Sequence, residues 1–261
     1  MGQHPFDISY VFEYFIRLLP SLRITLYIVG SSIAFGLIVG LLVALPQLYR
    51  VPVLQRLARI YISFFRGTPI LIQLFLFYYG LPELLKLIHI DVSKTPTLFF
   101  VILTYSLHSG AYISEVIRGA VTAVDRGQVE AAYAMGMNGY QAFIRIVMPQ
   151  ALAISIPVFA NVVLGNLKDT SLAFTLGILE ITGRAQTIGA LSQRFIEIYL
   201  SLALLYFIIC FVLERLFFRL ERRLLRFEQS AEAEQRLRRV EGSIFGRATS
   251  AAKLRNKEAR L

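Results

Sequence analysis

Cysteine, histidine and phosphate-binding sequences are scarce or absent in this chain, and each shortage excludes a class of protein. The 261 residues include one cysteine, Cys210, and three histidines. A single cysteine excludes a disulfide framework and a metal site built from cysteine pairs. The chain has no Gly-Lys dipeptide, so it lacks the loop with which many ATPases hold phosphate groups. We therefore expect this chain to bind no metal, no cofactor and no ATP itself.

Hydrophobic residues make up 56% of the chain, whereas soluble domains average about 45–50%. Charged residues are rare through long blocks and gather in the last fifth of the sequence. Each membrane-spanning helix needs about 20 largely apolar residues. These blocks predict an all-α integral membrane protein with about five transmembrane helices, at 22–45, 64–81, 97–121, 151–167 and 196–218.

The same composition divides the chain into three regions. Residues 1–19 are amphipathic and aromatic, which predicts a helix at the membrane interface. Residues 20–220 form the transmembrane domain, and residues 221–261 form a charged cytoplasmic tail. The sequence disfavours the alternative of a soluble protein with a large core, because no soluble helix needs so long a run without a charge.

Basic residues set the expected orientation in the membrane. Of the 27 Lys and Arg residues, 13 lie between 214 and 261 beside 7 of the 17 acids, so this region carries six of the ten net charges. Thirteen of the other fourteen basic residues divide almost evenly between the two sides, seven against six. Basic segments beside a spanning helix stay in the cytoplasm and contact anionic lipid. The tail therefore places the C-terminus inside and the N-terminus outside, and membrane lipid rather than nucleic acid is the expected partner.

Residues 124–149, which we call the coupling segment, separate the third and fourth expected spans and are too polar to cross a membrane. Two residue pairs typical of capped helix starts occur in the segment: Asp125 with Gln128, and Asn138 with Gln141. Gly136 is typical of a helix end, and Pro149 is expected to close the second helix. The sequence predicts two short cytoplasmic helices joined by a tight turn. Both ends are tied to spanning helices, which disfavours entry into a DNA groove and favours a rigid docking element.

This segment resembles the coupling motif of bacterial ABC importer permeases, in which Glu-Ala-Ala is followed at fixed spacing by Gly, Ile and Pro. The matching residues are Glu130, Ala131, Ala132, Gly136, Ile146 and Pro149. Met148 stands where that family usually has leucine, a change of similar volume. Further stretches resemble the polar amino-acid branch of the family: 65–69, 78–82, 127–128 and 168–172. The likeness covers residues 15 to 225, to within a few residues.

The resemblance implies a function and a set of partners. Such permeases pair with an identical or homologous permease chain and dock on a separate cytoplasmic ATPase subunit, which holds ATP and Mg²⁺. An extracytoplasmic solute-binding protein delivers the polar amino acid. The chain would then be a transport subunit of the bacterial inner (plasma) membrane and not an enzyme. Residues 183–186 and 192–193 resemble cystine permeases, but the sequence leaves open which amino acid is carried and whether the paired chains are identical.

Polar residues inside a membrane are costly, and they usually line a path or join helices. Four of them share one face of the third expected span: Tyr105, His108, Tyr112 and Glu115. Four more end the fourth span, where the resemblance implies a place near the substrate: Lys168, Asp169, Thr170 and Ser171. For each group, the alternatives are a substrate path and a purely structural role.

The second expected span is interrupted by Arg66, Gly67, Thr68 and Pro69. Gly and Pro break the backbone hydrogen bonding of a helix, which lipid does not tolerate unless protein or water covers the break. We interpret Arg66 as a clamp on this broken helix or as a charge that reaches the interface. The main alternative function is a secondary transporter or channel, which would need more ionisable groups in mid-span than His108 and a few end residues.

Overall fold

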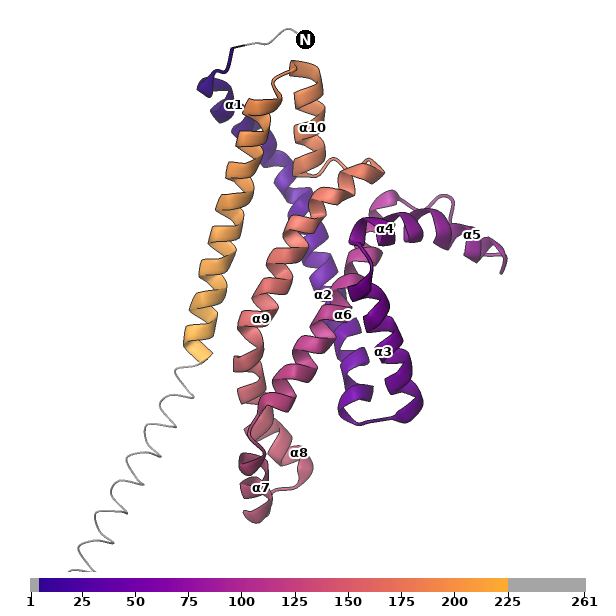
Figure 1. Ribbon diagram of the computed structural model, residues 1–261, viewed down its shortest axis with the longest axis vertical. Coiled ribbons are helices and arrows are strands. Elements are labelled where there is room, and N and C mark those ends of the chain that lie inside the picture. Colours follow the sequence, from indigo (N-terminus) through magenta and orange to yellow (C-terminus); the bar gives the residue numbers. More distant parts are fainter. Residues whose placement is uncertain (1–4, 225–261) are drawn as a thin grey trace, which may run out of the picture. The chain divides into compact units, whose positions relative to one another are not determined.

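The computed structural model describes residues 5–224, and every regular element in that part is a helix (Figure 1). Four helical runs are long and apolar enough to cross a membrane: Ile8–Leu48, Thr97–Ala123, Gly139–Leu176 and Phe195–Leu224. A bent pair, Pro52–Gly67 with Ile70–Lys86, counts as a fifth if it forms one broken span. The prediction of an all-α membrane protein with about five spans is confirmed. The tail from 225 onward lies outside the described residues.

The first run joins three elements: α1 (Ile8–Leu18), the short turn η1 (Leu19–Ser21) and α2 (Leu22–Leu48). Asp7 begins α1, because its carboxylate accepts a hydrogen bond from the Ser9 backbone N–H at 2.9 Å. Tyr14 and Leu18 are buried against α10 (Ile181–Ser192) and the helix Phe195–Leu224. The structure thus makes α1 continuous with the first span, and its predicted position at the membrane interface stays a prediction.

Small residues let α2 pack closely on α6 (Thr97–Ala123). A Cβ at Gly40 would lie 2.7 Å from Ile113 Cγ2, and one at Gly110 would lie 2.8 Å from Val39 Cγ1. These distances are shorter than real carbon contacts allow, so each glycine is needed for the approach of the two backbones. Gly36 and Gly40, four residues apart on α2, both face α6 of the same chain.

The second predicted span is sharply bent. Helix α3 (Pro52–Gly67) ends at the predicted break, and α4 (Ile70–Phe75), η2 (Leu76–Gly80) and α5 (Leu81–Lys86) follow at 110° to it. Thr68 and Pro69 have extended backbones between them. The prediction of the break is confirmed. The helix that contains the predicted start at residue 64 begins earlier, at Pro52.

Helices α7 (Arg126–Ala134) and α8 (Gly139–Ala142) follow α6 and lie at one end of the described bundle, while α1 and α10 lie at the other (Figure 1). The chain then runs through the π-helical turn η3 (Phe143–Val147) into α9 (Met148–Asp169) and η4 (Thr170–Leu176). The prediction that Pro149 closes a helix is wrong. Pro149 has no N–H to donate, and the wide turn before it lets the helix continue without that bond.

A buried carboxylate starts α10 after the left-handed turn at Gly177. The side chain of Glu180 accepts hydrogen bonds from the backbone N–H groups of Thr182, at 2.9 Å, and Gly183, at 2.8 Å. The Ile181 N–H is directed at the Thr25 hydroxyl, 3.3 Å away on α2. These contacts hold α10 against the first span, and the sequence reasoning did not single out any of them.

Candidate functional site

The coupling segment has the geometry that its sequence predicts. The Asp125 carboxylate accepts the Gly127 N–H at 2.8 Å and starts α7. Gly136 has φ +80° at the turn, a left-handed conformation that a residue with a Cβ disfavours. Asn138 and Gln141 then exchange side-chain to backbone hydrogen bonds of 2.9 and 3.0 Å, which start α8. The Asn138–Gln141 pair and the helix stop at Gly136 are confirmed, whereas at the start of α7 Asp125 caps the helix alone and Gln128 bonds to Gln150 instead.

Large apolar side chains surround this turn on its outer surface. Tyr133, Met135 and Tyr140 expose 53%, 82% and 75% of their surface. Glu130 and Ala131 are exposed beside them, whereas Ala132 is only 4% exposed and packs into its own chain. An exposed apolar patch on a rigid element is typical of a surface that another protein covers. The sequence reasoning identified Glu130 and Ala131 but missed the aromatic residues, which the motif does not include.

The inner side of the coupling segment is tied to α9. The Gln150 side chain donates to Gln128 Oε1 and to the Ile146 carbonyl, both at 2.9 Å. Val147 and Ala151 are buried in the same small core as the end of α6. Pro149 is exposed on the outer side of α9. The two short helices are therefore fixed to the spanning helices α6 and α9. A displacement of the coupling segment would move these spanning helices as well.

A pocket of 380 Å³, which we call the membrane pocket, lies between α6 and α9. The α6 residues that line it are His108, Ser109 and Tyr112, and α9 contributes Asn161, Asn166 and Asp169 together with small and branched apolar residues. The Asn166 side chain is 4% exposed and donates to Ser109 Oγ, but its Oδ1 has no partner among the described residues. A buried acceptor without a partner is costly, and this acceptor lies in the wall of the pocket.

The structure separates the four polar residues predicted on one face of the third span. His108 and Tyr112 line the membrane pocket. Tyr105 has no exposed surface, and its hydroxyl donates to the backbone carbonyl of Asp169. Glu115 lies further along α6, outside that pocket. Tyr105 therefore holds the end of α9 in place and does not itself reach the membrane pocket.

Gln73, which the sequence reasoning missed, joins the broken helix to the membrane pocket. Its fully buried amide donates to the carbonyls of Phe65 and Thr68, at 2.9 and 3.0 Å, and to the Thr68 hydroxyl at 2.8 Å. Its Oε1 lies 2.9 Å from His108 Nδ1. Because that oxygen can only accept, Nδ1 carries the proton and Nε2 of a neutral His108 is an acceptor.

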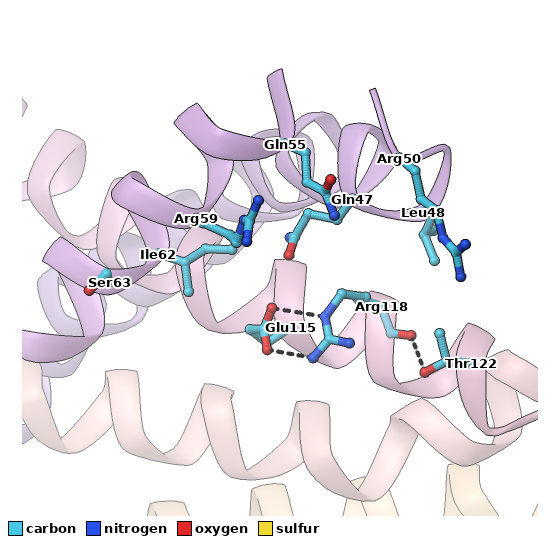
Figure 2. A pocket seen from close by; sticks show the side chains of 10 residues that line it. All are labelled: Gln47, Leu48, Arg50, Gln55, Arg59, Ile62, Ser63, Glu115, Arg118 and Thr122. Atoms are coloured by element: carbon cyan, nitrogen blue, oxygen red, sulfur yellow. Dashed lines mark hydrogen bonds and ion pairs between the residues drawn. The ribbon is translucent and has the colours of Figure 1, made fainter. Parts of the chain in front are cut away.

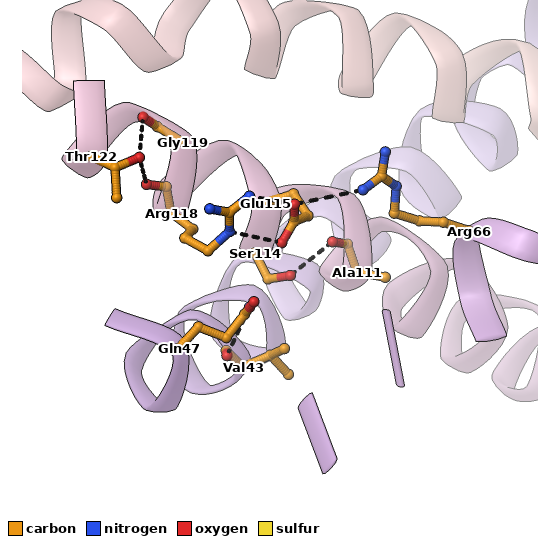
Figure 3. Close-up of polar contacts among 9 residues, drawn as sticks. All are labelled: Val43, Gln47, Arg66, Ala111, Ser114, Glu115, Arg118, Gly119 and Thr122. Atoms are coloured by element: carbon orange, nitrogen blue, oxygen red, sulfur yellow. Dashed lines mark hydrogen bonds and ion pairs between the residues drawn. The ribbon is translucent and has the colours of Figure 1, made fainter. Parts of the chain in front are cut away.

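Arg66 contacts α6 and not the break itself (Figure 3). Its guanidinium lies 3.7 Å from Glu115 and 5.4 Å from the centre of the Tyr112 ring. Glu115 also holds Arg118, one turn away, through two hydrogen bonds of 2.8 and 3.1 Å. Arg66 is therefore a link from α3 to α6, while Gln73 holds Thr68 at the break. Gly67 and Pro69 are exposed beside it.

The four residues at the end of α9 have different surroundings. Asp169 lines the membrane pocket, whereas Lys168 is exposed and points elsewhere. Thr170 is buried, and its hydroxyl donates to the Leu167 carbonyl at 2.6 Å. Ser171 is half-buried in η4. Of this group, only Asp169 presents a charged side chain to the pocket.

A bundle of long apolar helices with a largely apolar pocket between two of them, and two capped short helices at one end, is typical of a membrane transport subunit. Residues 36–226 match the family described as binding-protein-dependent transport system inner membrane component. The chain belongs to this family, and it is the permease component of an ABC importer rather than an enzyme.

Relatives from different bacteria share most of the chain. The L-cystine transport system permease protein TcyL of Bacillus subtilis (strain 168) is 44% identical over 219 residues, which are 84% of this chain and 92% of that protein. The octopine transport system permease protein OccM of Rhizobium radiobacter is 36% identical over 219 residues, which are 83% and 89%. A solved structure described as an amino acid ABC transporter with histidines has a TM-score of 0.75 and 29% identity, and the match covers 84% of this chain and 100% of that one.

Proposed function

We propose that this chain forms half of the path for a polar amino acid, with cystine the first candidate, and that the coupling segment links this path to a separate ATPase. The observation that carries the proposal is the membrane pocket, which combines one carboxylate with an unpartnered buried acceptor. The relatives described as cystine and octopine permeases support an amino acid as the substrate.

The chemistry of the membrane pocket fits an amino acid. The ammonium group of the substrate would lie against the Asp169 carboxylate, and a rotation of the buried Asn166 side chain would bring its Oδ1, a second acceptor, toward it. The Tyr112 hydroxyl and the Asn161 amide supply donors for the carboxylate group. The volume of 380 Å³ is within the range of about 300–1,000 Å³ that small-molecule sites occupy. His108, held by Gln73, would shape the pocket between the two groups.

Asp169→Asn is expected to raise the KM for amino-acid uptake about 10- to 100-fold, because one charged hydrogen bond to a buried ligand contributes about 1.5–3 kcal/mol. The shape of the side chain and the bond from Tyr105 to the Asp169 carbonyl are preserved. Uptake of radiolabelled cystine and of a panel of polar amino acids into proteoliposomes that contain the whole transporter measures this.

The neighbouring Lys168→Gln is the matched control, since it also removes one charge but lies outside the pocket. Equal KM values for both variants and the wild type would contradict a substrate contact at Asp169.

The proposed partners follow from the coupling segment. A cytoplasmic ABC ATPase would cover the exposed side chains of Tyr133, Met135 and Tyr140 and bind the ATP and Mg²⁺ that this chain has no loop to hold. A second permease chain, identical or homologous, would complete the path, and an extracytoplasmic solute-binding protein would deliver the substrate. This arrangement places the coupling segment and the C-terminus in the cytoplasm and the N-terminus outside.

Cysteine labelling in intact cells tests this orientation. With Cys210 replaced by serine, an impermeant thiol reagent is expected to label Ile88→Cys, in the exposed loop before α6, and to spare Met135→Cys at the docking turn. The cells express the permease without its ATPase, so both positions are well exposed and a difference reports the side of the membrane and not burial. Labelling of Met135→Cys before the cells are opened would reverse the proposed topology.

A further inference from the structure

A second pocket, of 660 Å³, opens between the ends of α2 and α3 on one side and the end of α6 on the other (Figure 2). We call it the basic pocket. Its polar lining includes Gln47, Arg50, Gln55, Arg59, Glu115 and Arg118. Thr122 lies in the same wall, one residue before α6 ends and four before α7 begins. The pocket is therefore on the same side of the membrane as the coupling segment.

Two of the three cations in the basic pocket have no carboxylate partner in the part of the chain that the structure describes. Arg118 is held by Glu115 through two hydrogen bonds (Figure 2). Among the described residues, no carboxylate lies within 4.0 Å of Arg50 or Arg59. The side chains of Gln47 and Gln55 line the same pocket (Figure 2). Two free guanidiniums with nearby amides are suited to an anion that has several acceptor oxygens, above all a phosphate group.

The backbone at Arg50 supports a role for its side chain. Arg50 forms the turn between α2 and α3 with φ +54°, a left-handed conformation for which glycine is the favoured residue. The Val51 N–H bonds to the Pro46 carbonyl at 3.1 Å and closes this turn. Backbone strain of this kind is often found at ligand sites. An arginine at this position places a cation in the lining of the basic pocket. Its left-handed backbone costs conformational free energy that a glycine would avoid.

Helix α3 combines this polar lining with an apolar outer face. Gln55, Arg59 and Ser63 follow one another at helical spacing on the side that lines the pocket. A different face carries the exposed side chains of Val53, Leu57, Ile60 and Phe64. A free phosphate ion would need only the first face, whereas a phospholipid has both a phosphate group and acyl chains. The two faces of α3 therefore favour a lipid over a soluble anion.

We propose that the basic pocket binds the phosphate group of an anionic membrane lipid, whose acyl chains lie along the apolar face of α3. That this lipid is in the cytoplasmic leaflet rests on the orientation given under the proposed function. The binding itself does not rest on transport or on the ATPase. A bound lipid would hold the α2–α3 turn against α6 beside the coupling segment.

Lipid titration of the purified full-length chain tests the proposal. In zwitterionic detergent, dioctanoyl phosphatidylglycerol is expected to bind in a one-to-one ratio by native mass spectrometry, and dioctanoyl phosphatidylcholine much more weakly. Arg50→Gln with Arg59→Gln should weaken phosphatidylglycerol binding about 30-fold, because each basic residue near an anionic surface contributes about a factor of five. Arg50→Lys with Arg59→Lys should retain most of it, since the charge is kept.

The matched control is Arg56→Gln with Arg145→Gln, which removes two exposed charges that do not line the basic pocket. Equal loss in this control, or equal binding of phosphatidylcholine, would overturn the proposal. Displacement of the lipid by an equal concentration of glycerol 3-phosphate would assign the site to a soluble phosphate and overturn the lipid. Because no uptake or ATP hydrolysis is measured, failure here leaves the proposed transport function untouched, and failure of transport leaves this site untouched.

Discussion

Gly136→Asp is expected to leave a permease that still inserts in the membrane. The rate of amino-acid uptake should fall more than 10-fold. The left-handed backbone at Gly136 alone costs a residue with a Cβ about 1–2 kcal/mol. Among residues 5–224, a Cβ at this position would meet no atom within 4 Å. The added carboxylate therefore projects from the docking turn, where it would strike a covering partner. Uptake in proteoliposomes and co-purification of the ATPase measure the effect.

Gly177→Asp separates backbone strain from loss of docking. Gly177 has φ +81° and equally open surroundings, but it lies at the opposite end of α9 from the coupling segment. This variant should lose similar stability and keep its ATPase. Glu130→Ala should weaken ATPase binding less than Gly136→Asp, since it removes one polar contact and introduces no clash. Normal uptake and co-purification for Gly136→Asp would mean that the coupling segment is not a docking element.

Gly40→Leu is expected to prevent the permease from folding to a stable state. A Cβ alone would lie 2.7 Å from Ile113 Cγ2 and 3.2 Å from the Gly110 carbonyl oxygen, so leucine would force α2 away from α6. Overpacking of a tight core lowers the free energy of unfolding by about 1–3 kcal/mol. Because leucine here would push two helix backbones apart, we expect a loss of about 3 kcal/mol or more. Loss of monodisperse protein after heating in detergent measures this.

Gly30→Leu is the matched control on the same helix. An added Cβ there would meet nothing within 4 Å, and the position is exposed on the bundle surface. It should therefore leave thermal stability nearly unchanged. A similar loss of stability in both variants would show that leucine disturbs α2 itself and not its contact with α6.

The coupling segment could be predicted closely from the sequence because its structure depends on near neighbours. Asp125 acts on the second residue after it, and Asn138 acts on the third. Gly136 could be predicted to adopt a left-handed turn because glycine is the residue that adopts positive φ at least cost. The prediction for Pro149 was wrong because a proline usually ends a helix. The neighbouring sequence does not reveal that the π-helical turn Phe143–Val147 lets the helix continue through it.

The membrane pocket could be predicted only in part, because its residues meet across long distances in the chain. Gln73 and His108 are 35 residues apart, and Tyr105 and Asp169 are 64 apart. Helical spacing correctly placed His108 and Tyr112 near each other, but it could not show that Tyr105 packs inward. Glu180 was missed for the same reason, since a carboxylate after a span is ordinary in sequence and only the fold shows that it is buried.

The central claim is that this chain couples amino-acid transport to ATP hydrolysis on another subunit. The most direct measurement is ATPase activity of the complex reconstituted in proteoliposomes, with a panel of amino acids and their solute-binding protein. The account predicts that the binding protein loaded with one polar amino acid, cystine first, stimulates hydrolysis several-fold, and that uptake stops when ATP is removed. Uptake that continues without ATP and follows an ion gradient would contradict it and indicate a secondary transporter or channel.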